Sequence, residues 1–146
     1  MSDIEFMELA YQQALLALAD DEVPIGAVVV KDGEVIATGY NQREKNQMVT
    51  DHAETIAIQK ACKLLGTWRL EGCTLYTTLE PCIMCSGVII NSRIDRVVYG
   101  AKESRWSALS SLYQIHATLN HQPEIVGGVL EEKCSKIIKD YFKNKR

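Results

Sequence analysis

The feature that most constrains the fold of this chain is a set of metal-binding residue types split between two distant segments. The first segment has the pattern H-x-E, with His52 and Glu54, and the second has the pattern P-C-x-x-C, with Cys82 and Cys85. One imidazole and two thiolates suit a tetrahedral zinc ion whose fourth position stays open for water. A fold that uses all three ligands must bring the two segments together.

Both segments are predicted to begin helices. The range 52–65 has helical periodicity, and a helix is also expected over 81–92. Pro81 suits the first helical position because its missing N–H would be unpaired there in any case. Cys82 and Cys85 then share one face of the first turn, where the partial positive charge of the helix N-terminus favours thiolates. Two helix starts that point at one spot would gather the three ligands.

Simpler explanations exist for each half of the pattern. A lone C-x-x-C is also typical of a redox pair, a structural half-site or buried cysteines, and a histidine at a helix start often has no further role. The joint pattern favours a catalytic zinc, because a structural zinc would need a fourth protein ligand. Glu54 is then the candidate proton carrier. The remaining cysteines are spread along the chain and are expected to be packing residues: Cys62, Cys73 and Cys134.

Periodicity along the whole chain predicts an α/β fold with helices on both faces of a mixed sheet. Asp3 is a plausible N-cap of the first helix. The polar range 41–50 is expected to be a loop. The predicted helices span 3–19, 52–65, 81–92, 112–119 and 131–145, and the predicted strands span 25–30, 34–40, 74–78, 96–99 and 124–126.

The composition is that of an ordinary globular protein, with 47% hydrophobic and 24% charged residues. We expect residues 1–146 to form one domain. A net charge of −3 does not indicate a nucleic-acid binder, although a local basic patch can act alone. The acidic N-terminus is not a signal peptide, and no apolar run is long enough to span a membrane. A cytoplasmic protein with reduced cysteines and no membrane partner is therefore predicted.

The joint motif resembles the signature of zinc-dependent nucleobase deaminases. Longer stretches are similar to bacterial tRNA-specific adenosine deaminases, within the zinc-dependent cytidine/deoxycytidylate deaminase family: 22–29, 68–76, 78–87 and 92–101. The similarity spans nearly the whole chain. It implies the cytidine-deaminase-like fold, a three-layer α/β/α sandwich with a mixed five-stranded sheet. It also implies a bound Zn²⁺, a homodimer, and conversion of the wobble adenosine of a tRNA anticodon to inosine.

The resemblance also implies roles for single residues. Glu54 would take a proton from zinc-activated water that attacks the ring carbon bearing the amino group. It would then pass protons to the ring nitrogen and the departing ammonia. Asn41, which alone would be taken for a turn residue, matches the asparagine that hydrogen-bonds the base. The stretch Pro24, Ile25, Gly26 and Ala27 matches the family's pocket wall.

Two departures from the family pattern leave the substrate open. Asp51 stands where the family usually has a small residue, and it either caps the helix or meets a donor on the substrate. The family's glycine-rich loop, which contacts the anticodon, is replaced by the range 102–112, which has no glycine and contains Trp106. This tryptophan could stack on a base, close over a small substrate, or pack in an interface or the core.

Two enzyme functions are therefore kept. We favour the deaminase of a tRNA anticodon stem-loop because of the whole-chain similarity. A basic chain end could also contact phosphates, although basic residues at a solvated helix end are common without such a role; it comprises Lys139, Lys143, Lys145 and Arg146. The alternative is a deaminase of a free aminated heterocycle such as guanine, another aminopurine, a pterin or a triazine. A zinc-holding binding module without activity would not require Glu54.

Overall fold

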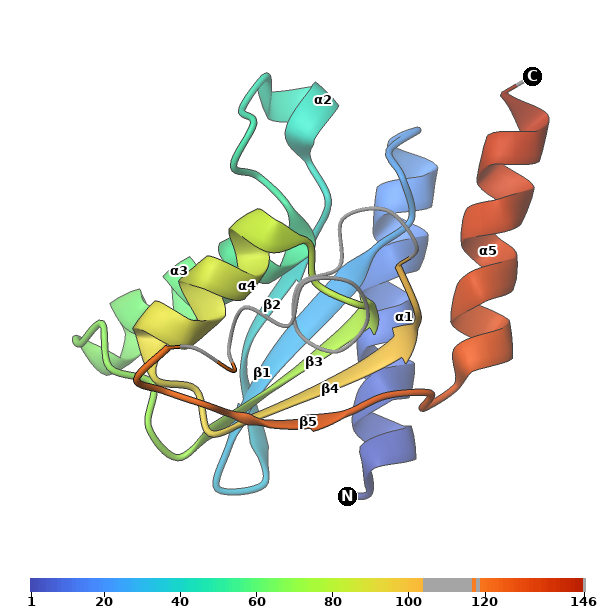
Figure 1. The fold of residues 1–146 in the computed structure, drawn as a ribbon. Helices are drawn as coiled ribbons and strands as arrows, with labels where there is room; N and C mark the ends of the chain where they lie inside the picture. Colours follow the sequence, from blue (N-terminus) through green and yellow to red (C-terminus); the bar gives the residue numbers. More distant parts are fainter. Residues whose placement is uncertain (104–116, 118, 146) are drawn as a thin grey trace.

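A mixed five-stranded sheet in the order β2-β1-β3-β4-β5 lies at the centre of the protein (Figure 1). The structure is a computed structural model and describes residues 1–103, 117 and 119–145. β1 runs antiparallel to both β2 and β3, whereas β3, β4 and β5 run parallel. The predicted mixed sheet is confirmed. Its strands are β1 (Gly26–Lys31), β2 (Glu34–Tyr40), β3 (Cys73–Leu79), β4 (Arg96–Ala101) and β5 (Glu124–Val126).

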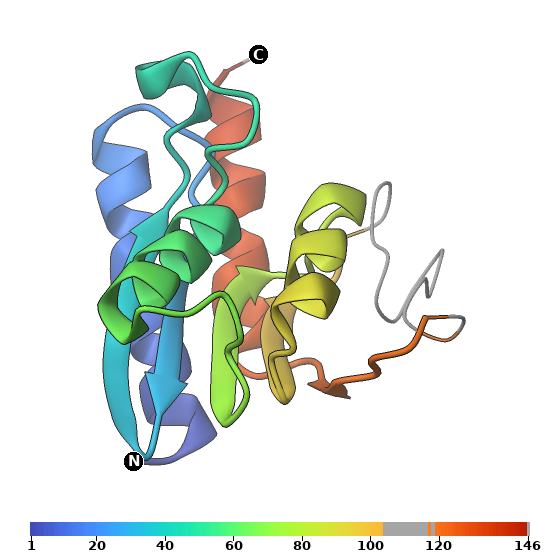
Figure 2. The same cartoon turned by 90° about the vertical axis from the view of Figure 1, so that its left-hand side faces the viewer.

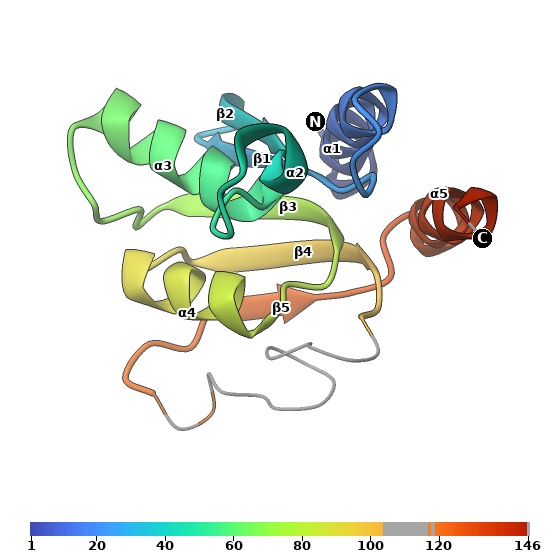
Figure 3. The same cartoon turned by 90° about the horizontal axis from the view of Figure 1, so that it is seen from above.

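Helices cover both faces of this sheet and complete the predicted three-layer sandwich (Figures 2 and 3). α3 (Ala53–Leu65) and α4 (Ile83–Ser92) pack on one face, over a core rich in alanine, valine and isoleucine. α1 (Asp3–Ala19) and α5 (Glu131–Asn144) lie on the other, where Phe6 packs on Tyr76. No helix in the described ranges is long and apolar enough to cross a membrane.

Four predicted features differ from the structure or lie outside it. The range 41–50 is not a plain loop, because it contains the one-turn helix α2 (Arg43–Asn46). The predicted helix 112–119 falls almost wholly outside the described residues, and so does Trp106. The prediction that Asp3 caps α1 is wrong. Ser2 is the N-cap, and its Oγ accepts a hydrogen bond from the Glu5 amide at 3.3 Å.

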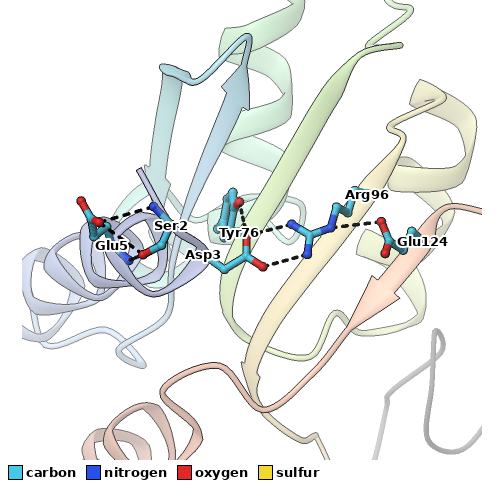
Figure 4. Close-up of polar contacts among 6 residues, drawn as sticks. All are labelled: Ser2, Asp3, Glu5, Tyr76, Arg96 and Glu124. Atoms are coloured by element: carbon cyan, nitrogen blue, oxygen red, sulfur yellow. Dashed lines mark hydrogen bonds and ion pairs between the residues drawn. The ribbon is translucent and has the colours of Figure 1, made fainter.

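The Ser2 cap belongs to an S-x-x-E capping box, since Glu5 Oε1 in turn accepts from the Ser2 amide at 3.5 Å (Figure 4). Asp3 is thereby left for a contact across the sheet. Its carboxylate binds the Arg96 guanidinium through two hydrogen bonds of 2.8 and 2.7 Å and accepts from the Tyr76 hydroxyl at 2.7 Å. This network fixes the start of α1 to β3 and β4.

The Asp3 network predicts how stability depends on pH. Mainly through its hydrogen bonds to Arg96, the pKa of Asp3 falls from 3.8 to about 2. The ionised carboxylate therefore contributes stability above about pH 4, and this contribution is lost as the pH falls towards 2. Burial and the bond to Asp3 raise the pKa of Tyr76 from 10.0 to about 12, so stability is also lost as the pH rises from 10 towards 12.

We expect Asp3→Asn to flatten the acid side of the profile of stability against pH, with stability measured as the urea midpoint of unfolding at pH values between 2 and 5. The effect is modest, because the Asp3 side chain is 34% exposed and solvent screens the pair. Asp32→Asn in the exposed β1–β2 turn is the matched control and should leave the acid side of the profile unchanged. An acid side as steep in Asp3→Asn as in the parent protein would contradict this role.

The strand directions determine where a site can form. Because β1 is antiparallel to both β2 and β3, the carboxyl ends of β2, β3 and the parallel β4 all meet at one edge of the sheet. α3 follows the end of β2 through the α2 segment, and α4 follows the end of β3. The starts of α3 and α4 therefore lie at this same edge, as the two motifs require.

Candidate functional site

The three candidate metal ligands lie at the starts of α3 and α4. His52 is the N-cap of α3, and Cys82 is the N-cap of α4, with Cys85 in the following turn. The prediction that Pro81 is the first helical residue is wrong, because α4 begins at Ile83. Cys82 is extended (φ −72°, ψ 178°) and its carbonyl accepts the first helical bond from the Ser86 amide at 2.8 Å, so Pro81 precedes the cap.

The ligand atoms form a compact triangle. His52 Nδ1 lies 3.8 Å from Cys82 Sγ and 3.5 Å from Cys85 Sγ, and the three ligand atoms are all within 4.8 Å of one another. Tetrahedral zinc with bonds of about 2.3 Å to sulfur and about 2.0 Å to nitrogen needs neighbouring ligand atoms about 3.5–3.8 Å apart. The triangle fits a zinc ion with one further position available.

The backbone around His52 is held from two sides. The Thr55 hydroxyl accepts from the His52 amide at 3.1 Å and also contacts the Thr50 carbonyl, which supports the start of α3 while the imidazole faces the cysteines. Gly39 on β2 lets α3 approach closely, because a Cβ at Gly39 would lie 2.4 Å from the Ala53 carbonyl oxygen. The position of His52 therefore depends on a residue outside the motif.

Electrostatics in the site favour a thiolate and a proton carrier. Hydrogen bonding from Cys85 and His52 outweighs burial and lowers the pKa of Cys82 to about 4. Burial raises the pKa of Glu54 to about 7, with the His52 charge opposing the shift. The Glu54 side chain is only 4% exposed and is outside the ligand triangle. A carboxyl group with a pKa near neutrality can both take and give a proton.

A cavity of about 510 Å³ opens over this triangle. Its floor includes His52, Cys82 and the buried acids Glu54 and Glu80. Exposed cations also line it, one each from α2, the end of β4 and α5: Arg43, Lys102 and Lys139. The cavity therefore has Glu54 as a candidate base at its floor and a border that carries three cations and the carboxylate of Glu103.

The predicted substrate contacts separate into two groups. Ile25 and Asn41 line the cavity, whereas the described lining does not include Gly26, Ala27 or Asp51. Gly26 is buried against α1, and a Cβ there would lie 2.1 Å from the Ala10 carbonyl oxygen. Ala27 is buried in the core beneath α3.

The alternative that Asp51 caps α3 is wrong, because His52 occupies the cap position. The Asp51 carboxylate instead accepts from the Asn46 side-chain amide at 2.8 Å. Ile138 and Phe142 of α5 also line the cavity, although neither belongs to a motif. Arg43 was missed because it lies in a polar stretch with no motif. The expected packing cysteines Cys73 and Cys134 are buried, and Cys62 is half-buried.

Comparisons with known proteins agree with this chemistry. The profile for "Cytidine and deoxycytidylate deaminase zinc-binding region" matches residues 1–101. A Bacillus subtilis protein named tRNA-specific adenosine deaminase is 46% identical over 143 residues, covering 97% of this chain and 89% of the relative.

Two solved structures extend the comparison. One comes from a study of A-to-I editing by tRNA:A34 deaminases, with a TM-score of 0.89, 44% identity, and coverage of 91% of this chain and 98% of that one. The other is a guanine deaminase from Bacillus subtilis, with a TM-score of 0.68, 44% identity, and coverage of 70% of this chain and 66% of that one. With its His52–Cys82–Cys85 triangle and its 46% identity to the Bacillus subtilis relative over 97% of its length, the chain belongs to the cytidine and deoxycytidylate deaminase family, in the branch that includes the tRNA-specific adenosine deaminases.

Proposed function

We propose that this protein hydrolyses the wobble adenosine of a tRNA anticodon to inosine, with release of ammonia. The observation that carries the proposal is the ligand triangle with Glu54 beside it, at the floor of a cavity with three exposed cations: Arg43, Lys102 and Lys139. Phosphate groups on both sides of a target nucleotide are complementary to such a border. The relatives named for tRNA support the same substrate class.

Each residue of the site then has a defined task. A zinc ion on His52, Cys82 and Cys85 supplies the Lewis acidity that makes water nucleophilic near neutral pH. Glu54 accepts the water proton and returns protons to the ring nitrogen and to the departing amino group. The base lies against Ile25, and Asn41 hydrogen-bonds it.

Asn41 is well held for this task. It is 7% exposed, its side-chain amide donates to the Val23 carbonyl at 3.4 Å, and its side-chain oxygen accepts from the Arg43 amide at 3.4 Å. An amide group has two N–H donors and an oxygen with two lone pairs, so one of each remains for a base.

The test is to incubate the zinc-loaded protein with an anticodon stem-loop that carries a wobble adenosine and to measure inosine by mass spectrometry. The matched control is the same stem-loop with guanosine at the wobble position, which should be unchanged. A panel of free aminated heterocycles is assayed in parallel for ammonia. Inosine in the stem-loop at a rate far above any free-base turnover is expected. Turnover of a small base with none of the stem-loop would overturn the proposal.

A free aminopurine is the second candidate substrate. The specific observation in its favour is the 44% identity with a guanine deaminase structure over 70% of this chain. The cavity volume does not discriminate, since about 510 Å³ is ordinary for small-molecule sites as well. The three exposed cations, Arg43, Lys102 and Lys139, favour the nucleic acid, because a neutral base offers no phosphate to bind.

We also infer a homodimer that forms through the outer face of α3 and α4. A cleft of about 650 Å³ lies there, lined in part by Ile58, Trp68, Met84 and Val88. Trp68 is 57% exposed, and Met84 and Val88 on α4 are half-buried. Exposed apolar side chains grouped around a cleft are typical of a protein interface.

Sedimentation tests the homodimer. Trp68→Glu should convert a two-chain species to a single chain, whereas Leu16→Glu on the exposed surface of α1 should leave the mass unchanged. A parent protein that sediments as one chain at micromolar concentration would refute the dimer.

A further inference from the structure

A buried carboxylate outside the metal site connects two segments that the chemistry above does not explain. Glu22 precedes β1 and is 2% exposed. Its Oε1 accepts from the Glu44 amide at 3.2 Å, and its Oε2 accepts from the Lys45 amide at 2.6 Å. A carboxylate so deeply buried is costly unless it is hydrogen-bonded, and both oxygens bind the first turn of α2. The burial of Glu22 thus serves to hold α2.

The residues beside Glu22 hold the same segment. The Val23 carbonyl accepts from the Asn41 side chain at 3.4 Å, and the Ile25 carbonyl accepts from the Asn41 amide at 3.1 Å. On the surface, the Lys45 ammonium lies 3.1 Å from an Asp20 carboxylate oxygen, but this exposed ion pair contributes little because solvent screens it. The stretch 20–25 therefore contacts the stretch 41–45 from its buried end to its exposed end.

Asp51 closes the other end of this segment. Its carbonyl accepts from the Gln42 amide at 3.0 Å, and its carboxylate accepts from the Asn46 side chain at 2.8 Å. The next residue is the metal ligand His52. Hydrogen bonds between its two ends therefore close the segment 41–51 directly before the metal site. Asp51, where this chain departs from the family pattern, has its partner within the same segment.

α2 needs these external bonds. It has only four residues, none of them buried, and Gln42 at its N-cap makes no side-chain capping bond. An isolated turn of this length is not stable in water, because nucleation fixes several residues for one hydrogen bond. Yet this segment carries Asn41 and Arg43, which both line the cavity.

We propose that Glu22 and Asp51 are positioning residues that pre-form the cavity wall made by the segment 41–51. The inference rests on the proposed function, because that wall is the one that meets the target nucleotide. If the segment is ordered in only a fraction of molecules, the apparent affinity for substrate falls by that fraction. Loss of either residue therefore raises KM more than it lowers kcat, since a bound substrate holds the segment in place.

The experiment compares Glu22→Ala and Glu22→Gln with the parent, using the wobble-adenosine stem-loop. Two charge-assisted hydrogen bonds are lost in Glu22→Ala, so KM should rise about tenfold or more, with kcat within about threefold. Glu22→Gln keeps an acceptor oxygen and should recover part of the loss. Hydrogen exchange at the Glu44 and Lys45 amides gives a readout without activity, and it should accelerate in Glu22→Ala.

Further variants keep the test decisive if Glu22→Ala fails to fold. Asn46→Ala removes the bond to Asp51 from an exposed position, and it should also raise KM and speed exchange in α2. Lys45→Ala is the matched control, because it removes only the exposed ion pair with Asp20 and leaves the Lys45 amide bonded to Glu22. The control should behave like the parent.

The outcomes separate this inference from the proposed function. A parent enzyme that leaves the stem-loop unchanged, with α2 exchange still accelerated in the variants, would reject the tRNA substrate but support the positioning role. An active parent whose Glu22→Ala and Asn46→Ala variants keep its KM and its α2 exchange rates would overturn the positioning role. A fall in kcat without a change in KM would also overturn it.

Discussion

Replacement of Glu54 by glutamine is expected to lower kcat by at least about 10³-fold while the protein still binds zinc. Glu54 is buried beside the ligand triangle and is not one of the three ligands, so its loss removes proton transfer and leaves the metal site. General acid–base catalysis by one positioned group is worth about 10²–10⁴-fold, and here one carboxylate serves several proton transfers. The measurement is single-turnover deamination, with the zinc content of each preparation determined in parallel. Glu54→Ala should give the same result.

Stability provides the control for this prediction. Because burial raises the pKa of Glu54 to about 7, the fold disfavours the charged form of this carboxyl group. A neutral amide of the same shape should therefore leave the thermal unfolding midpoint at or above that of the parent. A Glu54→Gln variant that binds zinc, folds normally and keeps kcat within tenfold of the parent would refute the proton-transfer role.

The metal site was predictable because each half of it is a short motif of neighbouring residues, H-x-E and P-C-x-x-C. Few residue types other than histidine and cysteine bind zinc in this way, so His52, Cys82 and Cys85 stand out in the sequence. Each of them lies where periodicity predicts the start of a helix. The alternating and helical patterns also predicted the mixed sheet and its covering helices. The strand directions then place both helix starts at one edge. The predicted helix starts are shifted by one residue at Asp3 and by two at Pro81. The S-x-x-E pattern of the Ser2 cap is present in the sequence, whereas the extended backbone of Cys82 cannot be read from residue type.

The surroundings of the site were less predictable because they depend on long-range contacts. α2 is stabilised by Glu22, a residue that precedes it by a whole β-hairpin, and no local pattern signals that bond. Asp51 suggested a cap or a substrate contact, and only the structure reveals its partner Asn46. Phe142 lies on the terminal helix and belongs to no motif, yet it is 42% exposed and lines the cavity. Periodicity shows which face of a helix is apolar, but not what covers that face.

The reaction and the substrate are therefore determined by different parts of this molecule. In the proposed reaction, the ligand triangle and Glu54 carry out the hydrolytic deamination of an amidine-like ring, whichever molecule contains that ring. Selection must come from the wall around them: Asn41 and Arg43 on one side, and α5 on the other. Trp106 stays a prediction, since it lies outside the described residues. Substitutions in the cavity wall, as at Asn41 or Arg43, should change KM and substrate preference. Substitutions at the cavity floor, as at Glu54, should change kcat.

Removal of the metal is the second change with a very large expected effect. Prolonged treatment with a chelator should reduce deamination to background, and addition of Zn²⁺ should restore it, because the ligand triangle provides the geometry for one tetrahedral ion and the reaction needs a Lewis acid. Cys82→Ala should give the same loss without recovery, since two ligands hold zinc far less tightly than three. Cys62→Ser, at a half-buried thiol outside the triangle, is the matched control and should keep the parent's zinc content and rate. Full activity in a zinc-depleted Cys82→Ala preparation would refute the metal-dependent reaction. Loss of zinc in Cys62→Ser as well would mean that fold integrity, rather than ligation, explains the effect.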